Sequence, residues 1–60
     1  MKHYTVTVNN RPFRSFSIRT EAIDMARLAS EFFAGDICRV THKNGNTVKG
    51  TPTFVNGKEI

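Results

Sequence analysis

The residues of this chain that could do chemistry are few and stand far apart. Cys38 is the single cysteine, and His3 and His42 are the two histidines. Nucleophilic catalysis needs a base beside the nucleophile and a third group that orients the base, and no motif joins these three residues. The alternating pattern around Cys38 places its thiol on the core-facing side of a strand, where an apolar environment lowers reactivity. We therefore expect Cys38 to be structural and expect no catalytic residue.

Metal and acid–base sites are not indicated either. Two histidines and one cysteine do not supply the four ligands of a zinc site at any standard spacing. The acids Glu21, Asp24 and Glu31 fall on the polar face of a predicted helix, whereas paired catalytic carboxylates need a pocket that separates their pKa values. The sequence predicts no metal, no cofactor and no enzymatic activity.

Length limits what can position such residues. The chain has 60 residues, and a domain of this size buries only about 60% of the surface that its unfolded chain exposes. We expect one small domain over residues 1–60, with its core in residues 1–52 and with residues 53–60 as a tail or a short last hairpin. A lone cysteine cannot form an internal disulfide, and no apolar run is long enough to span a membrane. The expected location is cytoplasmic, with no membrane partner.

The net charge of +4 is unevenly distributed along the chain. Residues 1–20 carry four basic and no acidic side chains, residues 21–36 are mainly acidic, and residues 37–60 are again basic. This division predicts an acidic helix face and a basic sheet face. A dipolar domain of this kind can orient itself on a charged partner.

Residues 4–18 have the pattern of a β-hairpin. Residues 4–8 alternate between apolar and polar side chains, residues 9–12 carry a turn signal, and residues 13–18 form the second predicted strand. Alternation directs Phe16 and Ile18 toward the core and Phe13 toward the opposite face.

An amphipathic helix of about fourteen residues follows this hairpin. Thr20 is the predicted N-cap, because its hydroxyl can accept a hydrogen bond from a first-turn N–H. Gly35 is suited to the position just after the helix. The apolar stripe predicted to face the core comprises Ala22, Met25, Ala26, Ala29, Phe32 and Phe33.

Residues 37–42 and 47–51 read as a second hairpin around a turn at residues 43–46. A two-residue loop would pair Val40 with Lys49, whereas a three-residue loop with Gly45 left-handed would pair Val40 with Val48. The second register is favoured because it places both valines on the core face. Pro52 then ends the strand, and Phe54 and Ile60 are the residues expected to anchor the last segment.

Together these elements predict an α+β fold, a two-layer ββαββ arrangement with one helix on one face of an antiparallel-rich sheet. The strand residues predicted to form the core with the helix stripe are Tyr4, Val6, Val8, Phe16, Ile18, Cys38, Val40 and Val48. The opposite face would carry mainly hydroxyl and basic side chains, with Phe13 as its single aromatic.

The function class favoured by this pattern is a non-enzymatic binding or regulatory protein that docks on a protein partner. The candidate partner-binding residues are Phe13, Arg19, Arg39, Lys43 and Lys49. The alternative is a nucleic-acid-binding domain that uses the same basic residues on phosphates and Phe13 to stack a base. A third reading is self-association into a homodimer through an open sheet edge.

The order of elements also resembles a known family. A hairpin, an alanine-rich helix that starts near Thr20 and Glu21, Gly35, and a strand carrying Arg39 are similar to the small coliphage inhibitors of host RNA polymerase and to small bacterial hairpin-helix-hairpin domains of unknown function. The resemblance covers roughly residues 3–42. It implies a sheet with one helix, an arginine on the third strand that contacts a partner, and a phage or mobile-element origin.

Overall fold

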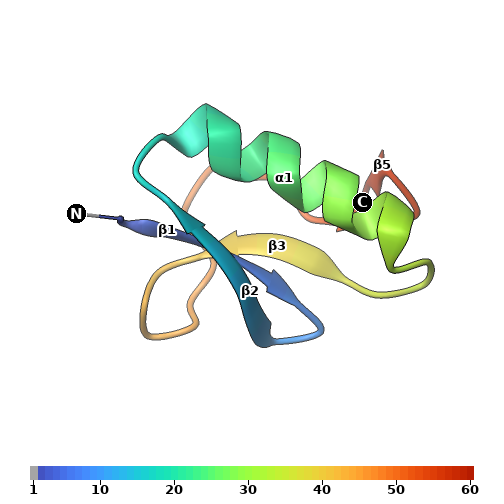
Figure 1. Cartoon of the computed structure of the whole chain (residues 1–60), viewed down its shortest axis with the longest axis horizontal. Helices are drawn as coiled ribbons and strands as arrows, with labels where there is room; N and C mark the ends of the chain where they lie inside the picture. Colours follow the sequence, from blue (N-terminus) through green and yellow to red (C-terminus); the bar gives the residue numbers. More distant parts are fainter. Residues whose placement is uncertain (1) are drawn as a thin grey trace.

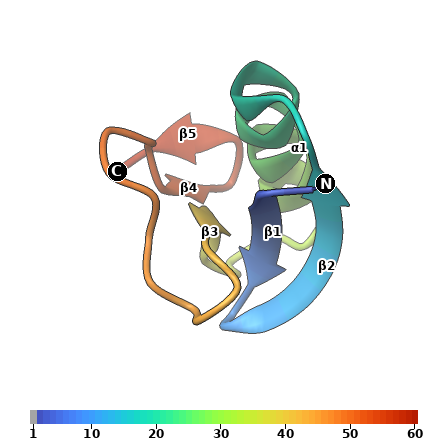
Figure 2. The same cartoon turned by 90° about the vertical axis from the view of Figure 1, so that its left-hand side faces the viewer.

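The computed structural model describes residues 2–60 as one helix packed on one face of a five-stranded antiparallel sheet (Figure 1). The sheet has the order β2-β1-β3-β4-β5 and bends around the helix, with β2 at one edge and β5 at the other (Figure 2). The α+β class and the single covering helix are therefore confirmed. The elements in chain order are β1 (Tyr4–Val8), β2 (Arg11–Phe16), α1 (Arg19–Phe32), β3 (Cys38–Thr41), β4 (Phe54–Val55) and β5 (Lys58–Glu59).

The first hairpin turns on two asparagines. Asn9 and Asn10 have φ values of 50° and 68°, and Val8 lies opposite Arg11 across this two-residue loop. Two left-handed residues give the loop a twist that matches the twist of the strands, and asparagine tolerates this conformation. The second strand consequently begins two residues earlier than predicted and ends at Phe16, so the half-exposed Ile18 lies beyond it and outside the core.

A β-bulge interrupts the alternation of β2. Val6 lies opposite Arg14 and Thr7 lies opposite Pro12, which leaves Phe13 as the extra residue. The Phe13 ring meets the Phe33 ring edge to face, with 5.6 Å between centroids. The prediction that Phe13 lies on the open sheet face is therefore wrong, because a bulge breaks the two-residue period on which it depended.

The helix begins at Arg19, two residues earlier than the start at Glu21 that a cap at Thr20 predicts. Ile18 is the N-cap and makes no side-chain capping bond, so Thr20 lies within the first turn and is not the cap. The buried residues of α1 form a narrow stripe of small side chains: Ala22, Ala26, Ala29 and Ser30. At 100° per residue, Phe32 lies roughly 105° away from the centre of this stripe.

The two helix-end phenylalanines are therefore not core residues. Phe32 is 77% exposed, and Phe33, the C-cap residue, is 39% exposed. The Phe33 ring meets Phe13 of β2 and does not enter the core between the layers.

The second hairpin has the predicted register, but its second arm does not form a regular strand. The Val48 N–H donates to the Val40 carbonyl at 3.0 Å, and Gly45 has a φ of +90°, as the three-residue loop requires. Beyond the isolated bridge between Thr41 and Thr47, however, residues 47–51 form no strand. The position beside β3 is occupied by β4.

The last eight residues form a third hairpin. Phe54 lies opposite Cys38 of β3 and is 4% exposed, whereas Ile60 is 73% exposed. Of the two predicted anchors, Phe54 is in the core and Ile60 is on the surface. The final segment is thus part of the sheet and contributes a large side chain to its core.

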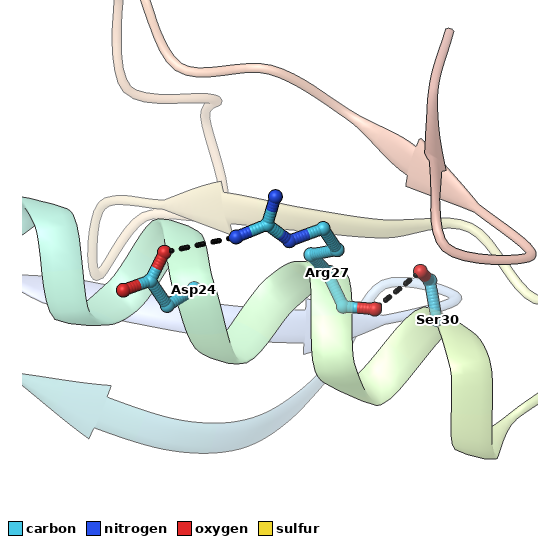
Figure 3. A network of polar contacts seen from close by, with 3 residues as sticks. All are labelled: Asp24, Arg27 and Ser30. Carbon is cyan, nitrogen blue, oxygen red and sulfur yellow. Dashed lines mark hydrogen bonds and ion pairs between the residues drawn. The ribbon is translucent and has the colours of Figure 1, made fainter.

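Polar contacts fix this hairpin to the end of α1. The buried Ser30 hydroxyl donates to the Arg27 carbonyl at 2.6 Å, and its oxygen accepts a hydrogen bond from the Gly57 N–H at 2.8 Å. Figure 3 shows Ser30 on the same helix as the exposed Asp24–Arg27 ion pair, whose atoms are 3.3 Å apart. The buried Ser30 hydroxyl therefore has one donor and one acceptor partner, as buried polar groups usually do, and it joins α1 to the turn between β4 and β5.

The core between the layers is small. Its buried apolar residues are Val6, Ala22, Ala26, Val40, Val48 and Phe54, and Tyr4, Phe16, Ile23 and Met25 pack around them half-buried. Cys38 is also buried, and burial, together with the nearby Asp36 carboxylate, raises the pKa of its thiol. The predicted core positions of Val6, Cys38, Val40 and Val48 are confirmed.

Candidate protein-docking surface

Four exposed apolar side chains come from α1, its C-cap and the bulge of β2. We call Phe13, Leu28, Phe32 and Phe33 the aromatic patch. Phe13 and Phe33 are in contact, and Leu28 and Phe32 are one helical turn apart on the side of α1 away from the buried stripe. Phe32 is 77% exposed and the other three are between 39% and 45% exposed.

The exposed area of this patch is substantial for so small a chain. An aromatic side chain carries about 150–250 Å², so the exposed fractions of the three rings alone leave roughly 230–390 Å² in contact with water. An exposed apolar patch of a few hundred Å² on a monomer is often functional. The patch is therefore the strongest candidate for a binding surface.

Charged residues border the patch. The Arg14 guanidinium carbon lies 5.4 Å from the centre of the Phe13 ring, in the range of a cation–π contact. On the outer face of α1, exposed Asp24 is paired with Arg27, and the Glu31 side chain extends over Gly57 in the turn between β4 and β5. Phenylalanine and arginine are enriched in protein interfaces relative to the rest of the surface.

Sequence reasoning assigned three of these side chains to other places and left Leu28 unassigned. Phe32 and Phe33 were predicted in the core, and Phe13 on the open sheet face. One signal was available in the sequence: Leu28 precedes Phe32 by four residues and lies outside the alanine stripe. That spacing indicates a second row of apolar side chains on α1, which faces away from the sheet and has no other element to cover it.

The open face of the sheet is partly covered by the chain itself. The Arg39 guanidinium donates to the Thr47 hydroxyl at 2.7 Å and to the Asn10 side-chain oxygen. It therefore joins the loop after β3 to the first hairpin, and Thr7 and Thr41 are buried on this side. A shallow hollow of about 300 Å³ remains between the two hairpins, and Lys43 lies at its margin.

The five predicted partner-binding residues do not share one face. Phe13 lies in the aromatic patch, and Arg39 is held on the open face. The Arg19 guanidinium donates to the Lys49 carbonyl at 3.0 Å, which brings those two residues together at the start of α1. Exposed Lys43 stands on the loop after β3. No stacking aromatic from this set accompanies the basic residues on the open face.

Within residues 2–60, no three His, Cys, Asp or Glu side chains come together to hold a metal ion. No helix in this described part of the chain is long and apolar enough to cross a membrane. Comparison with known proteins found no matching family model, no matching curated protein and no matching solved structure.

Proposed function

We propose that this chain is a non-enzymatic binding and regulatory protein that docks on a protein partner through the aromatic patch. The observation that supports the proposal is the exposure of Phe32 and Leu28 on α1, together with the contact between the exposed rings of Phe33 and Phe13. Removing such side chains from water contributes about 25 cal/mol per Å². A partner that covers the patch gains this free energy of burial, whereas in the free protein the same side chains stay in contact with water.

The charge beside the patch favours one orientation of the partner. Arg14 lies against the Phe13 ring, so a partner that carries an acidic side chain beside its apolar contact is favoured. Such complementarity raises the association rate more than it raises the affinity. The interaction is expected to form faster at low salt.

The experiment compares capture of proteins from a bacterial lysate by three immobilised forms of the chain. These are the wild type, the double variant Leu28→Ser/Phe32→Ser, and the control Ile60→Ser. Ile60 is as exposed as Phe32 but follows β5, at the opposite edge of the sheet. The proposal expects one protein to be retained by the wild type and the control and lost by the double variant.

Bacterial RNA polymerase, which the resemblance points to, is the first purified partner to test in the same format. A protein retained equally by all three forms would show that the aromatic patch is not the docking surface. Retention of nucleic acid, with an affinity that falls steeply as salt increases, would instead support the nucleic-acid alternative.

A further inference from the structure

The strand β2 forms an outer edge of the sheet, and part of its backbone is free to bind. Its neighbour on one side is β1, and within residues 2–60 the sheet order places no strand on the other side. An outer strand leaves alternate N–H and C=O groups directed away from the sheet, and another chain can pair with them.

The hydrogen bonds around β1 identify which groups are free. The Asn9 N–H donates to the Ile37 carbonyl at 2.8 Å, on the β3 side. In an antiparallel pair the hydrogen-bonded positions alternate along the strand, so the N–H and C=O groups of Thr7 and Thr5 also point toward β3. Ser15 lies opposite Thr5. Because the Thr5 backbone is used on the β3 side, the Ser15 N–H and C=O point outward from the sheet.

The second half of β2 is the part suited to pairing. Pro12 has no N–H to donate, and the bulge at Phe13 disturbs the strand next to it. Beyond the bulge, Arg14, Ser15 and Phe16 are regularly paired to β1. An added strand therefore has a regular edge from Arg14 onward.

A groove of about 450 Å³ runs beside this half of the strand. Its lining includes two basic side chains, Lys2 and Arg14, one acid, Glu21, and the half-exposed Ile18. Within β2 itself, Arg11 and Arg14 are the charged residues and there is no acid. A second copy of β2 paired antiparallel about Ser15 would place the two Arg14 side chains on the same face as diagonal neighbours, where their like charges repel.

We propose that the edge formed by Arg14–Phe16 of β2 and by the following residues as far as Ile18 binds an extended, acidic segment of a protein partner by adding it as a strand. The outward Ser15 groups exchange two hydrogen bonds with the segment, Lys2 and Arg14 contact its carboxylates, and an apolar side chain of the segment covers Ile18. This inference rests on the proposed function, because it names the kind of segment that a protein partner presents. It concerns a surface separate from Leu28 and Phe32.

The test measures binding of a fluorescent peptide of alternating valine and glutamate by fluorescence polarisation, up to about 1 mM peptide, the weak end of specific affinities. The variant Ser15→Pro removes the outward N–H, and proline is tolerated at an edge position whose N–H faces away from the neighbouring strand. Ser15→Ala is the matched control, since it keeps the N–H and loses the same hydroxyl contact to Thr5. We expect Ser15→Ala to bind like the wild type and Ser15→Pro to bind at least about tenfold more weakly.

A second probe avoids any change to the protein. The same peptide with N-methylated alternate residues should lose binding, and a version with lysine in place of glutamate should not bind. Equal binding by Ser15→Pro and Ser15→Ala, binding of the N-methylated peptide, or no binding of the acidic peptide would each overturn the inference. Self-association of the chain that Ser15→Pro abolishes would assign the edge to a second copy instead.

The two proposals fail separately. If the edge binds the peptide but Leu28→Ser/Phe32→Ser captures the same proteins as the wild type, the aromatic patch is rejected and the edge stands. If capture depends on the patch but the peptide result is negative, strand addition is rejected and the docking function stands.

Discussion

Replacement of Phe54 by alanine tests whether the last hairpin is part of the folding unit. The side chain is 4% exposed and lies in the core opposite Cys38. Burial of an aromatic side chain of about 150–250 Å² at about 25 cal/mol per Å² is worth at most about 4–6 kcal/mol. Measured phenylalanine-to-alanine changes in cores cost about 3–5 kcal/mol.

This cost is comparable with the entire stability of the domain. At about 0.05–0.15 kcal/mol per residue, a chain of this length has a free energy of unfolding of about 3–9 kcal/mol. We therefore expect Phe54→Ala to be largely unfolded or to unfold at very low urea concentration. Urea titration followed by far-UV circular dichroism measures the difference, and Phe54→Leu provides a variant mild enough to keep a folded baseline.

Ile60→Ala is the matched control, because the sequence pattern gave Ile60 the same anchoring role. Its side chain is 73% exposed, and burial of the remaining quarter is worth about 0.4–0.8 kcal/mol. If Phe54→Ala loses less than about 1 kcal/mol, or if the two variants have equal urea midpoints, residues 53–60 are a dispensable tail and the reasoning is wrong.

Three further changes test local features of the fold. Ser30→Ala leaves the Gly57 N–H without its acceptor and should lower the free energy of unfolding by about 1–2 kcal/mol. The higher helix propensity of alanine offsets up to about 0.5 kcal/mol of this loss. An unchanged urea midpoint would contradict the prediction. Thr20→Ala should leave thermal stability equal or slightly higher because Thr20 does not cap α1, whereas a loss of about 1 kcal/mol would show that it does. The raised pKa of the Cys38 thiol means that the folded chain keeps this proton longer than the unfolded chain, so stability should fall as the pH rises above about 9. Cys38→Ala should lack that slope, and rapid alkylation of the native thiol near neutral pH would refute its burial.

Local patterns were sufficient where the physical cause is itself local. The alternation of residues 4–8 predicts a strand with Val6 inward, and the glycine at position 45 predicts the loop that pairs Val40 with Val48. Both are confirmed, because side-chain alternation and left-handed turn residues depend on a few neighbouring residues. The helix and its alanine stripe are predicted by spacing for the same reason.

The candidate surfaces could not be predicted in this way. The position of Phe13 depends on a bulge that arises from the pairing of two strands, and the exposure of Phe32 depends on which residues of α1 the sheet covers. The role of Arg39 depends on two loops that are far apart in sequence and meet in space. None of these is encoded within a short window of residues.

The sequence by itself determined the α+β class, the hairpin–helix order, the inward positions of Val6, Val40 and Val48, and an uneven charge distribution. Only the tertiary structure decided that β4 rather than residues 47–51 completes the sheet, that Phe54 is a core residue, and that the aromatic patch stays on the surface. The physical reason is that a single helix with a narrow alanine stripe covers only part of the available apolar surface. Which side chains remain outside is settled by the packing of the whole chain.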